Sequence, residues 1–286
     1  MKKETKTIKK IIALGLIVIL LAVGFLGRKV YLDYRKEKLV AYAKEHRQDS
    51  GMVVFGDSIW DLNRGDNGMA DLVKEGMGGT GDIYNLSIRG TRATEDDAVE
   101  QTGINLSDIV DMIENGTNSI PSEYEASAVL DRLNTEHPYI RYAVIAYGLN
   151  DYFLGVRMEN PVKCFDPESY AGSLRTNIER VYGLFPGVTI ILAGPTFCVG
   201  YNNGTIDHDS DSFSYGGGTL LQYNEVARKV AGQYGMLFVD NYTDLGVDRG
   251  NSSKYLADGT HFTELGRRTY ADHFLYRLAQ QEYAGQ

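Results

Sequence analysis

Short apolar runs alternate along the chain with longer stretches in which apolar and polar residues are mixed. Strands of a parallel sheet are covered on both faces, so they carry near-continuous apolar runs instead of strict alternation. Five such runs predict strands at residues 52–55, 82–88, 141–147, 188–193 and 236–240. The mixed stretches predict helices at residues 66–75, 95–101, 106–115, 122–134, 167–184, 219–234 and 263–283. This alternation predicts one α/β domain with a doubly wound parallel sheet.

Two glycine-rich segments lie between these elements. Residues 199–218 are rich in Gly, Asn, Asp and Ser, which predicts a surface loop or lid. Residues 76–81 match the G-x-G-x-x-G pattern of dinucleotide-binding turns. In that motif the glycines follow a strand and open a helix, whereas here they precede a strand. We therefore interpret residues 76–81 as a loop.

The N-terminal part of the chain has a different character. Residues 11–27 are apolar and uncharged, which predicts a transmembrane helix at the short end of the usual range. Lysines crowd residues 1–10, so we expect a cytoplasmic tail and an uncleaved signal anchor. Residues 28–49 would then form a helical stalk, and residues 50–286 an extracytoplasmic catalytic domain. The alternative is a cleaved signal peptide and a secreted domain, although no small-residue cleavage site closely follows the apolar run.

Charge divides the chain at nearly the same point. Residues 1–47 carry 12 Lys and Arg against 4 Asp and Glu, whereas the remainder carries 17 against 34. The basic head suits an anionic membrane surface. The acidic remainder disfavours nucleic acid as a partner, because phosphate binding needs a basic surface. Cys164 and Cys198 fall in predicted loops, where they could pair or remain thiols, and their spacing matches no metal site.

Polar motifs follow three of the predicted strands. Ser58 stands in Gly56-Asp57-Ser58, Gly90 in Arg89-Gly90-Thr91, and Asn150 in Gly148-Leu149-Asn150-Asp151. The carboxyl ends of parallel strands share one edge of a sheet, where open α/β sheets place their ligands. Ser58 could be a nucleophile there if a histidine base reaches it, or it could merely cap a helix. Asp258-Gly259-Thr260-His261 offers such a base, with a carboxylate three residues ahead to orient the imidazole.

Together these four blocks resemble the SGNH (GDSL-type) hydrolase family, over roughly residues 52–270. The resemblance implies a flavodoxin-like three-layer fold with a five-stranded parallel sheet of order 2-1-3-4-5. It also implies a serine esterase that needs no metal or cofactor. The implied site comprises the triad Ser58, Asp258 and His261, an oxyanion hole from Ser58, Gly90 and Asn150, and supporting roles for Asp57, Gly148 and Asp151. The first block departs from the common family form at Ile59 and Trp60, which we expect to affect the acyl pocket.

The substrate is a separate prediction. The polar segment 199–218 and twenty tyrosines suit carbohydrate better than bulk lipid, although most tyrosines would serve packing. We therefore expect short acyl groups, O-acetyl first, to be removed from a small-molecule or polysaccharide substrate. Two alternatives stay open: a lysophospholipase or thioesterase, and a non-catalytic carbohydrate-binding module on the same scaffold. The sequence leaves the oligomeric state open.

Overall fold

The computed structural model describes residues 26–27, 30, 34, 37–38, 51–65, 67–79, 81–95 and 103–284. Its centre is a five-stranded parallel sheet of order β2-β1-β3-β4-β7, which is the predicted order because β7 is the fifth strand of this sheet. The strands are β1 (Gly51–Gly56), β2 (Ile83–Asn85), β3 (Ile140–Ala146), β4 (Thr189–Ala193) and β7 (Leu237–Val239). Every residue of β1 is buried, as the apolar run predicts for a central strand.

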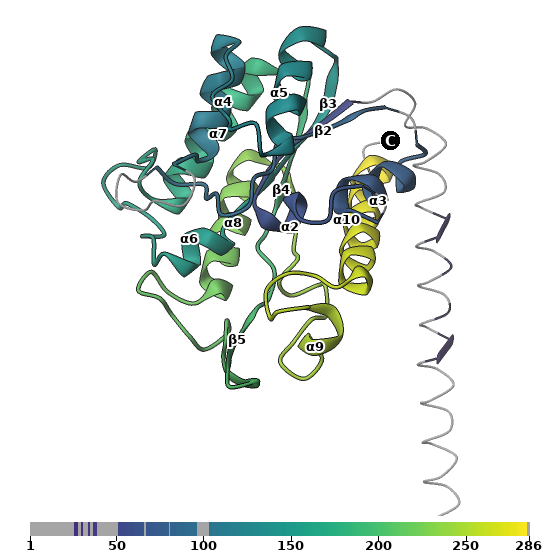
Figure 1. Cartoon of the computed structure of the whole chain (residues 1–286), viewed down its shortest axis with the longest axis vertical. Coiled ribbons are helices and arrows are strands. Elements are labelled where there is room, and N and C mark those ends of the chain that lie inside the picture. The colour runs from purple at the N-terminus through teal and green to yellow at the C-terminus, as the bar shows by residue number, and fades with distance from the viewer. Residues whose placement is uncertain are drawn as a thin grey trace, which may run out of the picture.

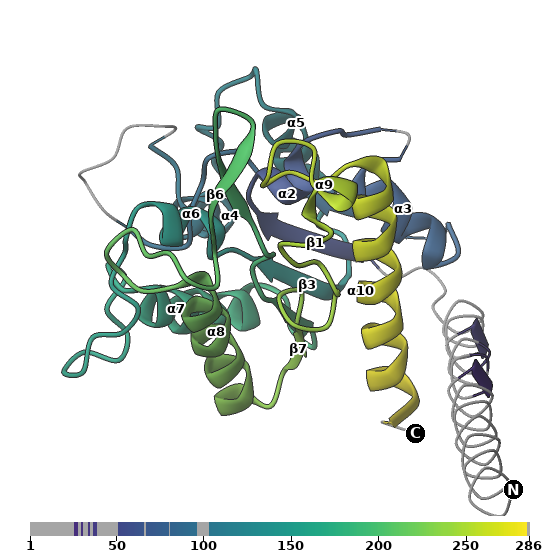
Figure 2. The same cartoon turned by 90° about the horizontal axis from the view of Figure 1, so that it is seen from below.

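Helices cover both faces of the sheet, which gives the three layers visible in Figures 1 and 2. One face carries α3 (Met69–Gly76) and α10 (Glu264–Ala284), which pack against each other. The other face carries α4 (Leu106–Asn115), α7 (Tyr170–Leu184) and α8 (Leu220–Tyr234). The remaining helices are α2 (Ser58–Asp61), α5 (Glu125–Glu136), α6 (Leu149–Phe153) and α9 (Ser252–Tyr255). The short helices α2 and α6 each begin just after a strand of the sheet ends, α2 after β1 and α6 after β3.

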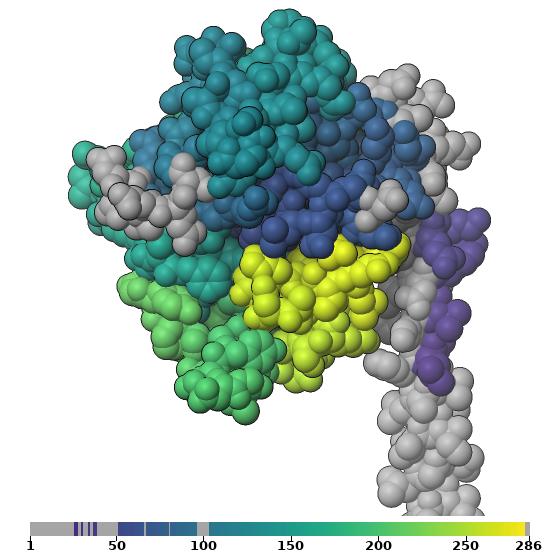
Figure 3. Space-filling model, viewed as in Figure 1, coloured from purple at the N-terminus to yellow at the C-terminus, as the bar shows by residue number. Residues whose placement is uncertain are grey.

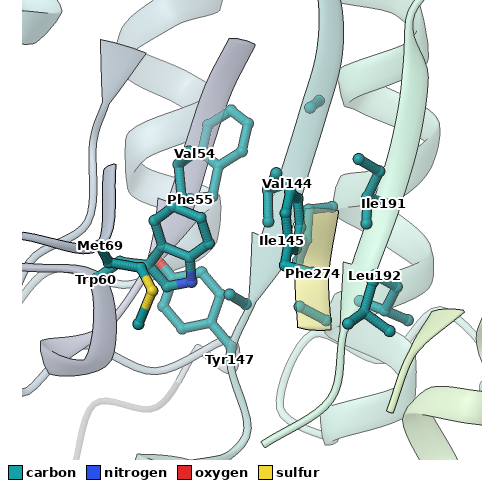
Figure 4. Close-up of a cluster of buried hydrophobic side chains, with 14 of the residues drawn as sticks. Val54, Phe55, Trp60, Met69, Val144, Ile145, Tyr147, Ile191, Leu192 and Phe274 are labelled. Carbon is teal, nitrogen blue, oxygen red and sulfur yellow. The ribbon is translucent and has the colours of Figure 1, made fainter. Parts of the chain in front are cut away.

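The core lies between the sheet and these helices (Figure 4). Trp60 of α2 is almost fully buried there, with its ring edge-on to Tyr270 and Phe274 of α10. Its indole Nε1 donates a hydrogen bond to the Tyr270 hydroxyl, so the polar end of the ring is satisfied. Trp60 therefore anchors the segment after β1 to the opposite end of the chain.

The segment at residues 199–218 is more ordered than the prediction of a loop or lid. It contains an antiparallel hairpin of β5 (Val199–Asn202) and β6 (Thr205–Asp209). Asn203 and Gly204 both have positive φ at its tip. The dipeptide Asn-Gly favours such two-residue hairpin turns. The overall composition of the segment indicates only a loop, so this local signal was overlooked. In Figures 1 and 3 the green segment around β5 lies beside the yellow segment that contains α9.

The predicted transmembrane helix and the localisation derived from it must be corrected. A helix needs about 20 mainly apolar residues to cross a membrane. Within the described part of the chain, no helix is both long enough and apolar enough to do so. The longest of them, α10, has 21 residues but carries charged side chains throughout. Residues 1–25, most of the stalk at 28–49, and residues 96–101 of a predicted helix lie outside the described residues.

Candidate active site

Ser58 lies where the buried central strand β1 gives way to α2. Asp57 caps this helix, because its Oδ1 accepts a hydrogen bond of 3.0 Å from the backbone N–H of Ile59. Ser58 is the first residue of α2 and is only 8% exposed. The capping role that competed with catalysis thus belongs to Asp57, and the Ser58 hydroxyl is left for other partners.

The turn before α10 brings a histidine to that hydroxyl. The Nε2 atom of His261 lies 2.9 Å from Ser58 Oγ, and its Nδ1 lies 2.6 Å from Asp258 Oδ2. The other oxygen of Asp258 accepts hydrogen bonds from the backbone N–H groups of Thr260 and His261. A proton on Nδ1 directed at Asp258 leaves Nε2 to accept from Ser58. Residues separated by 203 positions are thus joined in one hydrogen-bonded chain.

Gly259 allows this turn to approach the β5–β6 hairpin. Its φ is +92°, and a Cβ atom there would lie 2.4 Å from the carbonyl oxygen of Val199. The Gly259 carbonyl accepts a 2.8 Å hydrogen bond from the Val199 N–H. A side chain would both strain the backbone and push the hairpin away. The hairpin therefore supports the Asp258–His261 turn from behind.

Three hydrogen-bond donors belong to residues that line the pocket at the carboxyl edge of the sheet. The structure gives no acceptor, among the described residues, to the backbone N–H groups of Ser58 and Gly90. The side-chain Nδ2 of Asn150, at the start of α6, donates to the Thr91 carbonyl over 2.6 Å. That bond fixes the amide while leaving its second N–H available. Ser58, Gly90 and Asn150 line the same pocket as His261.

Asp151 is fully buried and holds the loop that contains Gly90. Its carboxylate accepts hydrogen bonds from the backbone N–H groups of Ala93 and Thr94 and from the Thr94 hydroxyl, at 3.0–3.2 Å. Gly148, just before α6, has a φ of +129°, and a Cβ there would lie 2.6 Å from the Tyr170 hydroxyl oxygen. Neither residue lines the pocket beside Ser58, and their supporting role stays a prediction of the sequence.

The three carboxyl groups of the site have different environments. Burial, followed by the charge of Asp151, raises the pKa of Asp57 to about 7, although the hydrogen bond from Ile59 opposes this. Burial also raises the pKa of Asp151 against the hydrogen bonds from Ala93 and Thr94. Partial burial acts in the same direction on Asp258, but the hydrogen bonds from His261 and Thr260 outweigh it and lower the pKa of that carboxyl. Asp258 is therefore the one carboxyl group of the three whose surroundings favour its ionised form.

A pocket of about 540 Å³ opens beside Ser58 and His261. The sequence did not single out several of the side chains that form its walls: Leu62, Arg89, Tyr124, Leu149, Phe153 and Thr260. Arg89, Leu149 and Thr260 stand within the polar blocks, where no role was assigned to them. The other three lie outside those blocks, so no local pattern marks them. Ile59 and Trp60 are not among the lining residues, which corrects the expectation that they affect the acyl pocket. Trp60 is in the core, and Ile59 lies against a separate small pocket.

A second pocket of about 310 Å³ adjoins the first, since Phe153 and Thr260 line both. Its walls combine the hairpin residues Tyr201 and His208 with Tyr152, Tyr215 and Asp258. The rings of Tyr152 and Tyr215 pack edge-on with centroids 5.1 Å apart. The polar segment 199–218 therefore contributes an aromatic wall next to the candidate triad.

Residues 54–269 match the family model of the GDSL-like lipase/acylhydrolase family. The chain belongs to this family. It is accordingly a carboxylic ester hydrolase, and the resemblance drawn from the four sequence blocks is confirmed. No curated protein matches the chain.

Solved structures agree with the GDSL-like hydrolase fold. A possible lipase from Chitinophaga pinensis matches with a TM-score of 0.54 and 15% identity, over 81% of this chain and 98% of that one. An acetyl xylan esterase matches with a TM-score of 0.50 and 16% identity, over 78% and 97%. An aryl esterase from M. smegmatis matches with a TM-score of 0.50 and 14% identity, over 82% and 99%. At these identities the likeness establishes the fold.

Cys164 is exposed and Cys198 is buried, and each is a free thiol. Burial raises the pKa of the Cys198 thiol to about 12. Within the described residues, no group of three or more His, Cys, Asp or Glu side chains is arranged to hold a metal ion.

Proposed function

We propose that this hydrolase removes short acyl groups, O-acetyl first, from carbohydrate through a Ser58–His261–Asp258 triad. The observation that carries the proposal is the hydrogen-bonded chain from Asp258 through the imidazole to Ser58 Oγ, with contacts of 2.6 and 2.9 Å. A serine hydroxyl is a weak nucleophile at neutral pH, and a neighbouring oriented base is what activates it.

In the acylation step, Ser58 Oγ attacks the ester carbonyl carbon while His261 Nε2 takes the hydroxyl proton. Asp258 stabilises the imidazolium that forms. The tetrahedral intermediate then collapses, the bond to the alcohol oxygen breaks, and His261 returns the proton to that oxygen. The sugar hydroxyl leaves and an acyl-serine remains. Water activated by His261 then attacks the acyl-serine, which releases the carboxylic acid and restores Ser58.

The oxyanion would be held by the N–H groups of Ser58 and Gly90 and by the Asn150 amide. The backbone groups have no competing acceptor among the described residues, and the amide is already oriented by Thr91. Such preorganised donors are worth about 3–4 kcal/mol each in the transition state. Asp151 contributes indirectly, because it fixes the loop on which Gly90 lies.

The aromatic pocket beside the triad supports carbohydrate as the substrate. Tyr201 and Tyr215 are each about two-fifths exposed, so their rings are available to a ligand. Sugar rings combine an apolar face with hydroxyl groups, and aromatic rings with polar neighbours such as His208 suit both. The fold shared with an acetyl xylan esterase is consistent with this substrate class. A lysophospholipase or thioesterase activity is the competing outcome of the test.

Hydrolysis of p-nitrophenyl esters from acetate to palmitate by the purified chain tests the proposal. We expect acetate to be cleaved fastest and Ser58→Ala to lower kcat by at least about 10⁴-fold, because the nucleophile is lost. Ser122→Ala, at an exposed position, is the matched control and should retain activity. Acetylated oligosaccharides should then release acetate.

A maximum at long acyl chains would reassign the substrate to lipid. If Ser58→Ala kept wild-type activity, the triad assignment would be wrong.

A further inference from the structure

The pocket beside Ser58 has an unusual charge for this chain. The protein has a formal charge of −9, yet no Asp or Glu is among the described residues that line the pocket. Among the described residues that line the pocket, Arg89 alone carries a permanent charge. It directly precedes Gly90 in the sequence and lines the same pocket as Ser58, Gly90 and Asn150.

Asp61 positions Arg89 but does not neutralise the positive charge of Arg89 and Arg64 together. Oδ2 of Asp61 accepts from both the backbone N–H and Nη1 of Arg89, at 3.0 and 3.3 Å. Oδ1 accepts from Nε of Arg64 at 2.8 Å. Arg64 donates its other groups to two backbone carbonyls, those of Asn85 and Ser87. Two guanidinium groups therefore share one carboxylate, which leaves a net positive charge.

The remaining donors of Arg89 are available to a ligand. The structure gives its Nε and Nη2 no hydrogen-bond partner among the described residues, and its side chain is 52% exposed. The guanidinium group stacks 5.1 Å from the centre of the Tyr124 ring, which also lines the pocket. Stacking on one face leaves the edge of the group free, and that edge is the fork that matches carboxylate or phosphate oxygens.

We propose that Arg89 is a specificity-determining residue that binds an anionic group, a carboxylate or a phosphate, on the ester substrate. The inference rests on the proposed esterase function and narrows its substrate to acyl esters of acidic compounds, such as acetylated acidic sugars. Asp61 and Tyr124 hold the guanidinium group toward the pocket, and the excess charge attracts the anion.

The experiment compares two acetyl esters that differ in charge: 3-acetoxybenzoate and its neutral methyl ester. The readout is the ratio of kcat/KM for the anionic to the neutral ester. A general loss of active enzyme lowers kcat/KM for both esters equally, so it cancels within the ratio of one protein. The difference in leaving-group chemistry between the two esters is the same for wild type and variant, so it cancels when their ratios are compared. Arg89→Gln should lower the ratio about tenfold, as expected for one partly exposed charge-assisted hydrogen bond. The change should lie mainly in KM.

Arg132→Gln is the matched control. Arg132 also stacks on a tyrosine, Tyr84, is similarly exposed, and does not line the pocket. Arg132→Gln should leave the ratio of kcat/KM for the two esters unchanged. Arg89→Lys should keep part of the preference, because it keeps the charge and loses the fork. Added salt should reduce the wild-type ratio and leave the ratio of Arg89→Gln nearly constant.

Equal losses on both esters in Arg89→Gln, or no change on either, would overturn the inference while leaving the esterase function intact. A wild-type chain that cleaves neither ester would overturn the proposed function and this inference with it. Replacing the carboxylate by a phosphate, as in 3-acetoxyphenyl phosphate, distinguishes the two anions, because the preferred one should show the larger dependence on Arg89.

Discussion

Ser58 and Asp258 stand at opposite ends of one hydrogen-bonded chain, but their surroundings differ sharply. Ser58 is 8% exposed and follows a strand with every residue buried, whereas the Asp258 side chain is 56% exposed on a surface turn. His261, between them, has a side chain that is 31% exposed. The buried half is held by tertiary contacts, and the exposed half by hydrogen bonds within four residues and by the hairpin behind Gly259.

Because of this difference, substitutions in the two halves should affect folding stability and turnover to different extents. Carboxyl groups on the buried half sit inside the fold, so changing them should affect folding as well as turnover. The carboxyl group on the exposed half can be changed with little effect on folding. Three Asp→Asn substitutions, identical in chemistry and different in place, test this contrast.

Asp258→Asn should have the largest effect on turnover. The amide cannot stabilise the imidazolium and favours the wrong tautomer of His261, so kcat should fall by about 10²-fold or more. The melting temperature should change little, since the side chain is exposed and an asparagine oxygen can still accept from the backbone of Thr260 and His261. Ester hydrolysis and thermal unfolding of the same sample give both values. A large drop in melting temperature with full activity would contradict the contrast.

Asp151→Asn should affect both properties. Its two carboxylate oxygens accept from Ala93 and Thr94, and an asparagine side chain has one oxygen with which to accept. A buried N–H would lose its partner, which costs about 1–3 kcal/mol of unfolding free energy. Turnover should fall about tenfold as the loop carrying Gly90 shifts. Denaturant unfolding and kinetics measure the two effects, and an unchanged unfolding free energy would show that the buried half tolerates this change.

Sequence patterns predicted the parts of the molecule that depend on local chemistry. The apolar runs located the strands of the sheet, and α4 begins and ends where it was expected. His261 lies on a turn beyond β7, which β3 and β4 separate from β1, so the order of the sheet alone does not place it beside Ser58. The other three polar blocks follow strands of the sheet, and the shared carboxyl edge of those strands brings Ser58, Gly90 and Asn150 to one pocket. Chain order and the rule that parallel strands share an edge carried that inference.

Features that depend on the path of a side chain through space could not be predicted in this way. Trp60 adjoins the nucleophile in sequence but points into the core, because Tyr270 and Phe274 provide its packing and a hydrogen-bond partner. Arg89 adjoins Gly90 and faces the pocket because Asp61, from another segment, holds it. The β5–β6 hairpin was missed for a different reason, since its composition suits both a loop and a two-residue turn.

Asp57→Asn should have the smallest effect on turnover and a specific effect on the pH dependence of stability. The amide oxygen of the variant would still accept from the Ile59 N–H, so the cap survives. Burial raises the pKa of the wild-type carboxyl from 3.8 to about 7, so between these values the folded state binds a proton that the unfolded state has released. Stability contributed by this group is therefore complete at low pH and is lost as pH rises from about 4 to 7, by up to about 1.4 kcal/mol per pH unit.

Asp57→Asn removes that titration. The unfolding free energy of the variant minus that of wild type should therefore increase as pH rises through this window. Denaturant unfolding at several values between pH 4 and 8 measures the difference. If the unfolding free energies of the two proteins changed with pH in parallel, Asp57 would be ionised in the folded state. The charge of Asp151 contributes to the raised pKa. Asp151→Asn should therefore lower the pKa of Asp57, so that the fall in unfolding free energy ends at a lower pH than in wild type. Asp258→Asn, on the exposed half, should leave the pH range of that fall unchanged.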